Sequence, residues 1–166
     1  MVEISVFVTN LGKYNEGKLI GEWVDLPVSN SELEEVLERI GIDDEYEEYF
    51  ITDYEAPFKI DEYDNLDELN DLAERIDALR DADAFVAALQ AYDIDEAIER
   101  VEKGDYIAYA GCRNMGDVAY EYLTEFGCVD FPEWIRPYFD FDAYGRDMEI
   151  DSTFCSYNDN YYEFLD

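Results

Sequence analysis

The sequence predicts an α+β fold of three small domains, with mixed α/β ends that flank a helical middle. Strand-like alternation of apolar residues occurs toward the two ends, whereas residues 62–103 show helical periodicity with no strand between the helices. Hydrophobic residues make up 48% of the 166 residues and aromatic residues 16%, although the formal net charge is −33. Chains with so high a charge often stay unfolded when their hydrophobicity is low, but this apolar content predicts a folded core.

Residues 1–61 are predicted to form an amino-terminal α+β domain of three strands and one helix. Alternation predicts strands over residues 3–9, 18–26 and 48–55, with a hairpin turn over residues 10–17. A helix is expected over residues 29–41, because Ser31 with Glu34 fits a capping box and Gly41 suits the C-terminal end. Apolar residues recur there at i, i+3, i+4 and i+7, which gives this helix one apolar face.

Residues 62–103 are predicted to form a central helical domain. Asn65 with Glu68 can cap a first helix, and a second helix is expected over residues 82–92. Asp93 with Glu96 can cap a third helix, which is expected to stop at Gly104.

Residues 104–166 are predicted to form a carboxy-terminal α+β domain. Strands are expected over residues 105–111 and 160–165, a helix over residues 116–127, and a short helix opened by Pro132. The chain has no Ser-, Gly- or Pro-rich linker, so the three domains are expected to abut.

The charge balance limits the kind of partner that this chain can bind. Its 44 acidic and 11 basic side chains oppose nucleic acid and anionic membranes, because DNA binding depends on lysine and arginine neutralising phosphates. A basic protein is therefore the expected partner. No apolar run approaches the ~20 residues that span a bilayer, and the first ten residues lack a basic n-region, so a cytoplasmic location is expected.

Several enzyme classes are disfavoured by what the chain lacks. It contains no histidine, which excludes Ser-His and Cys-His nucleophile pairs and weakens the case for a zinc hydrolase. Cys112, Cys128 and Cys155 fit no CxxC pattern and are expected to be reduced, buried or half-buried thiols. Nothing in the spacing of the carboxylates selects a catalytic pair. The chain is therefore expected to have no enzymatic activity and no cofactor.

Residues 140–151 resemble a calcium-binding loop at its first, third and sixth positions, which are Asp140, Asp142 and Gly145. However, Tyr144 replaces the oxygen ligand at the fifth position and Asp151 the bidentate glutamate at the twelfth. No specific metal site is therefore expected.

Half of the carboxylates lie in residues 43–103, and many of these recur on single helix faces. Like charges at i, i+4 destabilise a helix by a few tenths of a kcal/mol per pair, and the pairs Asp71–Arg75, Glu96–Arg100 and Glu99–Lys103 relieve only part of this repulsion. A charged face is ordinarily a solvated face. Yet solubility of a small domain needs a net charge of only about 2–8, which leaves most of the charge unexplained.

An alternative is that ordered carboxylates imitate phosphates. Duplex DNA carries one negative charge per about 1.7 Å, so a net charge of −33 corresponds to roughly 56 Å of duplex, or about 16 base pairs. A folded aromatic framework would hold these charges in a fixed array.

Several stretches of this chain resemble the ArdA antirestriction proteins of conjugative elements and phages. They are "NLGKYNEGKLIGEWVDLP", "DEYEEYFITDYEAPFKIDEY" followed by "NLDELN", and "AYGRDMEI". The likeness runs from the first predicted strand to near the end, and its most specific matches lie in the amino-terminal half. The middle helices and "CVDFPEWIRPYFDF" follow the family in character rather than in residues.

The resemblance implies an elongated, curved chain of three small domains that forms a homodimer through residues 104–166. Its acidic side chains would be arranged like the phosphates of bent B-form DNA. It would occupy the DNA-binding groove of type I restriction-modification enzymes, chiefly the methyltransferase core of specificity and modification subunits, and so protect incoming DNA. The dimer surface stays unassigned: Tyr106, Tyr109 and the carboxy-terminal aromatic residues are candidates, but a core role is favoured for each of them.

The expected partner-binding residues are exposed members of the acidic stripes. They are Asp43, Asp44, Glu47, Glu48, Asp67, Asp71, Glu74, Asp95, Glu99 and Glu102. Two other functions stay open at this point. One is an acidic chaperone for basic, histone-like proteins, and the other is an acidic hydrolase.

Overall fold

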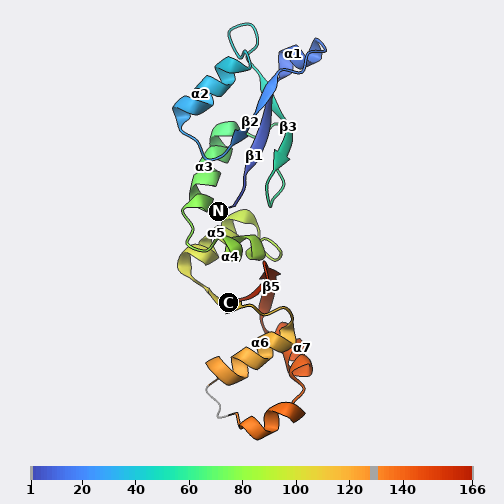
Figure 1. The fold of residues 1–166 in the computed structure, drawn as a ribbon. Coiled ribbons are helices and arrows are strands. Elements are labelled where there is room, and N and C mark those ends of the chain that lie inside the picture. The colour runs from blue at the N-terminus through green and yellow to red at the C-terminus, as the bar shows by residue number, and fades with distance from the viewer. Residues whose placement is uncertain (1, 128–130, 166) are drawn as a thin grey trace. The chain divides into compact units, whose positions relative to one another are not determined.

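The computed structural model describes residues 2–127 and 131–165, which form two compact units, residues 1–82 and 83–166. Each unit holds a three-stranded antiparallel sheet and helices (Figure 1), so the predicted α+β class is confirmed. Helix α3 belongs to the first unit and helix α5 to the second. The division into three domains stays a prediction.

The first sheet has the strand order β2-β1-β3, with β1 over Ser5–Asn10, β2 over Gly21–Asp25 and β3 over Tyr49–Glu55. The three predicted strands are therefore confirmed, with shorter bounds. Val6 lies opposite Val24, and Val8 lies opposite Ile51. All four side chains are buried. Because side chains alternate between the two faces of a strand, these residues define one buried face of the sheet.

The hairpin turn predicted over residues 10–17 is in part a short helix, α1 (Leu11–Asn15). The reason lies in Asn10, whose side-chain oxygen accepts a hydrogen bond from the backbone N–H of Lys13 at 2.9 Å and caps the helix. The amide nitrogen of Asn10 donates to the carbonyls of Ile40 and Gly41 at 3.2 and 2.9 Å. One buried asparagine thus joins the end of β1 to the C-terminal end of helix α2 (Asn30–Arg39).

Helix α2 spans Asn30–Arg39, and its N-cap lies two residues before the predicted cap. Ser29, not Ser31, is the N-cap, and its hydroxyl accepts a hydrogen bond from the N–H of Glu32 at 3.2 Å. The same Ser-x-x-Glu spacing occurs at both serines, so this spacing alone cannot select one of them. Gly41 follows the helix with φ +78°, a left-handed conformation that favours glycine, as predicted.

Helix α3 (Leu66–Asp77) is capped by Asn65, as predicted. Its buried side includes Leu66, Leu69 and Ile76, and also a polar residue, Asn70. The side-chain amide of Asn70 accepts from the backbone N–H of Val28 and donates to its carbonyl, both at 2.9 Å. This paired bond fixes α3 to the segment that follows β2.

The second unit combines a helical segment, a sheet and a carboxy-terminal helical region. Its helices are α4 (Ala82–Ala88), α5 (Ile94–Lys103), α6 (Met115–Glu121), the π-helix η1 (Tyr122–Phe126), the 3₁₀ helix η2 (Glu133–Tyr138) and α7 (Phe141–Asp151). Its sheet has the order β4-β6-β5, with β4 over Tyr106–Ala110, β5 over Thr153–Tyr157 and β6 over Asn160–Phe164. The caps predicted for α5, Asp93 and Gly104, are confirmed.

Helix α7 and strand β5 are absent from the sequence prediction. Helix α7 occupies the stretch compared above with a calcium loop, and Asp140 is its N-cap, with a side chain that accepts from the N–H of Ala143 at 2.9 Å. Gly145 brings α7 against α6, because a Cβ there would lie 2.3 Å from the carbonyl oxygen of Met115.

The core of the second unit confirms the structural role expected for Tyr109. This residue is fully buried, and its hydroxyl donates to the carboxylate of Glu163 at 2.9 Å. Burial and this hydrogen bond raise the pKa of the Tyr109 hydroxyl. Cys112 and Cys155 are buried free thiols, as expected, while Cys128 lies outside the described residues. Burial, assisted by a hydrogen bond to Glu121, raises the pKa of the Cys112 thiol to about 12.

We expect Asn70→Ala to lower the free energy of unfolding by about 2 kcal/mol, because it removes two hydrogen bonds from a buried site. Asp71→Ala is the matched control, since Asp71 is exposed on the same helix and its replacement should change stability by less than about 0.5 kcal/mol. Urea denaturation measures both values. Equal stability of the two variants would contradict the role assigned to Asn70.

Candidate partner-binding surface

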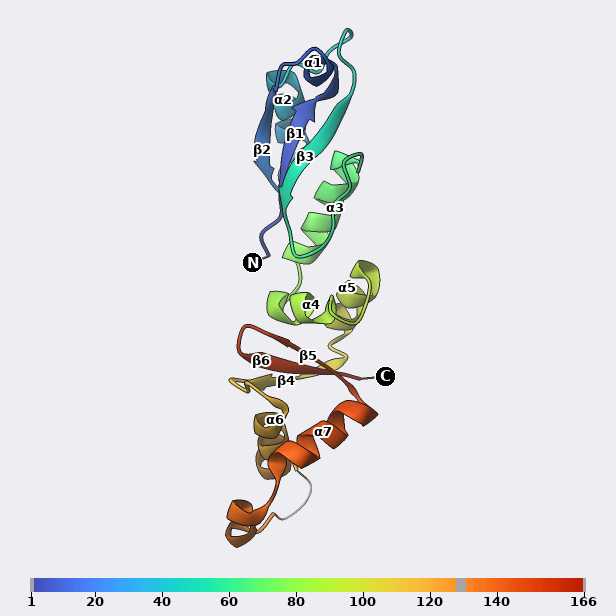
Figure 2. The same ribbon diagram turned by 90° about the vertical axis from the view of Figure 1, so that its right-hand side faces the viewer.

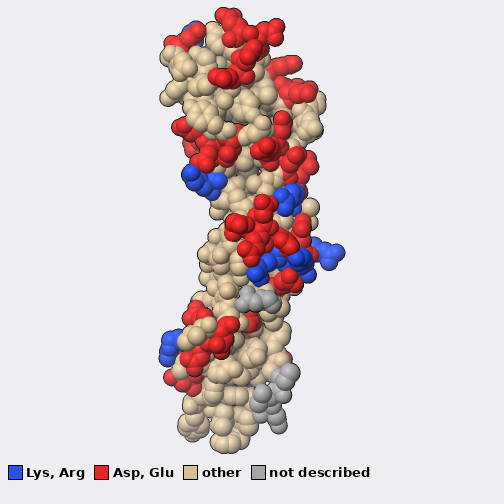
Figure 3. Space-filling view, turned by 180° about the vertical axis from the view of Figure 1, so that it is seen from behind, with Lys and Arg blue, Asp and Glu red and all other residues tan. Residues whose placement is uncertain are grey.

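All ten carboxylates predicted from the sequence to bind a partner are exposed. They form three groups. The acidic loop is residues 43–48 between α2 and β3, and the acidic faces of α3 and α5 are Asp67, Asp71 and Glu74, and Asp95, Glu99 and Glu102. Figure 3 shows Asp and Glu side chains spread over the visible face of the first unit, with Lys and Arg side chains beside them in a few places.

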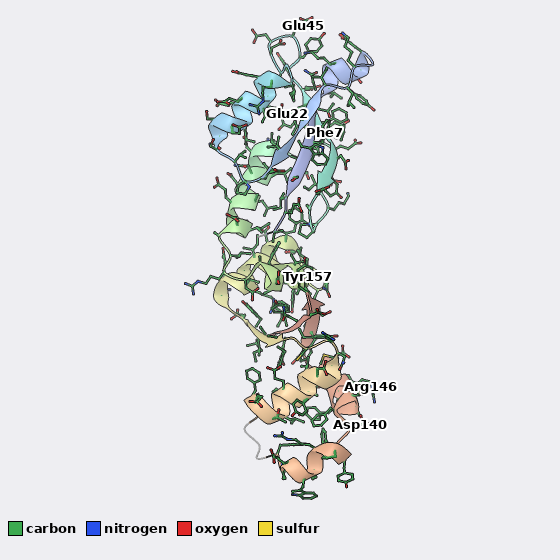
Figure 4. All side chains as sticks on the ribbon, viewed as in Figure 1. Phe7, Glu22, Glu45, Asp140, Arg146 and Tyr157 are labelled. Atoms are coloured by element: carbon green, nitrogen blue, oxygen red, sulfur yellow. The ribbon has the colours of Figure 1, made fainter. Side chains whose placement is uncertain are left out.

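The acidic loop has a fixed backbone turn although it contains five carboxylates. The carboxylate of Asp43 accepts hydrogen bonds from the N–H groups of Glu45 and Tyr46, each at 2.9 Å. The N–H of Asp43 donates to the carbonyl of Tyr46 at 3.0 Å, and the carbonyl of Glu48 accepts from Leu11 at 3.0 Å. Glu45 lies at the end of the unit (Figure 4). The two backbone donors lower the pKa of the Asp43 carboxyl and keep it ionised.

Tyr46 attaches this loop to α1. Its ring lies against Gly12, where a Cβ would be 2.4 Å from the ring. Its hydroxyl donates to the carboxylate of Glu16 at 2.9 Å, and the ammonium of Lys13 lies 5.3 Å from the ring centre. The hydrogen bond from Tyr46 lowers the pKa of Glu16. The tyrosine therefore positions the loop, while the neighbouring carboxylates stay in solvent.

A groove of about 370 Å³ separates α1 from the acidic loop. Gly12 and Asn15 line one side, and Asp44 and Glu47 line the other. Three of the predicted residues, Asp44, Glu47 and Glu48, thus line the same groove of the first unit.

The acidic face of α3 lies on the side of the helix away from its buried residues. Asp67, Asp71 and Glu74 are exposed, while Leu66, Ala73 and Ile76 are buried on the other side of the helix. The N-terminal end of α3 is held by Asn65 and by Leu66, whose N–H donates to the Tyr49 hydroxyl at 3.0 Å. A helix anchored in this way fixes the spacing of its carboxylates.

The acidic face of α5 is partly neutralised by ion pairs. Glu96 pairs with Arg100 at 3.0 Å and Glu99 pairs with Lys103, which confirms two of the predicted pairs. The hydrogen bond from Lys103 lowers the pKa of Glu99. Arg100 also lies over the Tyr92 ring and donates to the carbonyl of Leu165 at 2.7 Å. Part of the charge on α5 therefore serves the second unit's own structure.

The sequence analysis missed exposed carboxylates on α2. Glu34 and Glu38 are exposed one helical turn apart, the same spacing that selected residues on α3 and α5. Their neighbour Arg39 pairs with Glu22 and Glu32 at 2.7 and 2.9 Å, so α2 also carries compensated acids. Applying the spacing rule to this helix as well would have found Glu34 and Glu38.

Neither a metal-binding cluster nor a membrane-spanning helix occurs among the described residues. Among them, no group of three or more His, Cys, Asp or Glu side chains is placed to hold a metal ion. Within the same residues, no helix has the length and apolar character needed to cross a membrane.

We expect the stability contribution of Asp43 to depend on pH. Because its pKa is lowered in the folded state, this contribution is present above the unfolded-state pKa of about 3.9 and is lost as pH falls through the folded-state pKa. Asp43→Asn keeps an accepting oxygen but cannot titrate. The difference in free energy of unfolding between wild type and this variant, measured by urea denaturation from pH 7 to pH 3, should therefore shrink at the acidic end.

The control variant Asp44→Asn removes a neighbouring charge and so accounts for general repulsion between carboxylates. A difference that is the same for both variants at every pH would contradict the prediction.

Comparison with curated proteins gives no match. The family model of the antirestriction protein ArdA matches residues 6–163, which is nearly the whole chain and covers all three acidic groups. On this evidence, the chain belongs to the ArdA family of antirestriction proteins.

Proposed function

We propose that this protein inhibits type I restriction-modification enzymes by occupying their DNA-binding groove in place of DNA. Membership of an antirestriction family implies an interaction with restriction-modification enzymes. The observation that carries the finer proposal is that the acidic loop and the acidic faces of α3 and α5 expose carboxylates from hydrogen-bonded elements. The proposed target is the methyltransferase core of specificity and modification subunits. Incoming mobile-element DNA would then escape modification and cleavage.

The spacing of charge on α3 supports mimicry of a DNA strand. A helix rises 1.5 Å per residue, so Asp67, Asp71 and Glu74 place three charges along about 10.5 Å. A DNA strand places one phosphate per about 3.4 Å of axis. The acidic face of α3 therefore carries about two-thirds of the linear charge density of one DNA strand.

The mechanism needs no chemical step from this chain. Ionised carboxylates would meet lysine and arginine side chains that otherwise contact phosphates, and a net charge of −33 would steer a basic groove toward the inhibitor. The inhibitor would act as a homodimer joined through the second unit, which exposes 72% of Trp134 and 86% of Tyr138. The cytoplasmic location stays a prediction.

A competition experiment tests this function directly. The purified chain is titrated into a complex of a type I methyltransferase with labelled target DNA, and DNA release is followed by fluorescence anisotropy. We expect complete release at stoichiometric excess, and weaker inhibition as salt is raised, because contacts between charges are screened. Undiminished DNA binding at excess inhibitor would contradict the proposal. Equal affinity for an unrelated basic protein, such as hen lysozyme, would favour the chaperone alternative.

Neutralisation of the α3 face tests which carboxylates take part. Asp67→Asn, Asp71→Asn and Glu74→Gln together should weaken inhibition about thirtyfold at low salt, taking about 0.7 kcal/mol per contact. The matched control replaces Asp95, Glu99 and Glu102 in the same way. It should weaken inhibition less, because Glu99 already bonds Lys103. Inhibition constants from the same competition assay measure both effects. A larger loss from the α5 triple would assign the main contact to the second unit.

A further inference from the structure

One face of the first sheet carries aromatic side chains that the acidic groups do not explain. The buried face holds Val6, Val8 and Val24, so Phe7 and Trp23 point to the opposite side. Figure 2 looks onto this side of the sheet, with α2 behind the strands. Figure 4 likewise shows Phe7 on the side away from α2. Trp23 is 47% exposed.

The strand register surrounds this aromatic pair with carboxylates. Trp23 and Asp53 lie opposite Phe7 on either side, and the next row on the same face places Asp25 and Glu55 opposite Ser5. Neighbouring strands lie about 4.8 Å apart. Three exposed carboxylates, Asp25, Asp53 and Glu55, therefore stand within one or two strand spacings of two rings. We call these residues, with Phe7 and Trp23, the aromatic-acidic face.

Specific contacts hold the side chains of this face. The Phe7 and Trp23 rings meet edge to face with centres 5.6 Å apart. Gly21 leaves room for the Phe7 ring, since a Cβ there would lie 2.9 Å from it. The Ser5 hydroxyl donates to Asp25 at 2.6 Å. The rings and at least one carboxylate are thus positioned before any partner arrives.

Further along the same face, Phe50 extends the aromatic surface. It lies opposite Thr9, and its ring meets Tyr14 and Tyr63 at centre distances of 5.1 and 6.4 Å. Tyr14 and Tyr63 are 50% and 71% exposed.

At the other end of the face, Ser5 and Asp25 line a groove of about 310 Å³ together with Val2 and Leu26. The face therefore combines apolar walls, ring faces and carboxylates.

This combination fits arginine better than other groups. A guanidinium can stack on an aromatic ring and bond a carboxylate through its planar fork, while its methylenes pack on apolar surface. A purely apolar segment would leave Asp25, Asp53 and Glu55 without a partner. A second copy of this chain fits this face poorly, because its 44 acidic and 11 basic side chains would mostly bring carboxylates against Asp25, Asp53 and Glu55.

We propose that the aromatic-acidic face binds an arginine-bearing surface of the restriction-modification enzyme, with a guanidinium over Trp23 and against Asp53 or Asp25. This inference rests on the proposed function and deepens it. A DNA phosphate can bond the same arginine, but it provides no aromatic ring on which the guanidinium can stack. The contribution of Trp23 to the binding affinity would then be nearly independent of salt, whereas the contribution of the acidic groups would fall as salt is raised.

The test compares Trp23→Ala, Trp23→Phe and Asp25→Asn/Glu55→Gln with wild type in competition for the type I methyltransferase at 50 and 300 mM NaCl. Trp23→Ala should lose about tenfold in affinity at both salt concentrations, and Trp23→Phe should lose less. Asp25→Asn/Glu55→Gln should lose more at low salt. Tyr157→Ala, an exposed aromatic of the second unit, is the control and should match wild type. If the wild type competes and the affinity of Trp23→Ala lies within twofold of the wild-type affinity, the inference is overturned.

A second measurement separates this inference from the proposed function. Trp134→Phe leaves Trp23 as the sole tryptophan, because the chain has two. Its fluorescence is titrated with a capped tetra-arginine peptide and with the tetra-lysine equivalent. The arginine peptide should change Trp23 emission at a concentration at least several-fold lower. Equal responses to both peptides would overturn the inference even if the wild type displaces DNA, whereas failure of the wild type to displace DNA contradicts the proposed function alone.

Discussion

Repulsion among carboxylates is the constraint on which the rest of this structure depends. With 44 acidic and 11 basic side chains, every element must fold while its own charges oppose compaction. In the first unit, apolar and acidic residues are separated onto opposite sides of the helices. Aliphatic side chains such as Val36 on α2 and Ile76 on α3 are buried, and the carboxylates stand on the opposite sides of the same helices. Burial of apolar surface supplies the favourable free energy, and solvent screens the charges.

Hydrogen bonds then fix where individual charges stand. Asp43 accepts two backbone N–H groups, and Tyr46 binds Glu16 while its ring rests on Gly12. In α3 the buried Asn70 pairs with the backbone of Val28, which sets the rotation of the helix and so the direction of its acidic face. The aromatic ring of Tyr46 thus helps to hold the neighbouring carboxylates of the acidic loop in fixed positions. A charged segment without such contacts would sample many arrangements.

The sequence predicted most elements whose signals are local, but it placed the cap of α2 wrongly and missed α7 and β5. Asn65, Asp93 and Gly104 mark helix ends through neighbours one turn away, and all three are correct. Helix α7 was missed because Gly145 and alternating polar residues weaken its periodicity, and its glycine is explained only by the approach of Met115. Strand β5 was missed although Asn158 and Asp159, both with positive φ, form the kind of two-residue turn that joins hairpins. The exposure of the acidic stripes could be predicted from helical spacing. The aromatic-acidic face could not be predicted, because alternation in a strand does not show which face of the sheet a helix covers.

The two kinds of surface on the first unit have different physical consequences for competition with DNA. In the proposed competition, carboxylates on helix faces would stand in for phosphates, and an enzyme groove could not distinguish such charges from DNA by sign alone. Charge of this kind gives fast association that weakens as salt rises. The half-exposed Trp23 beside Asp25 would add a contact that depends on ring geometry and on arginine. DNA held by the same groove presents phosphates and no aromatic ring in that position. An inhibitor that combines both surfaces therefore gains affinity from a source that its competitor lacks.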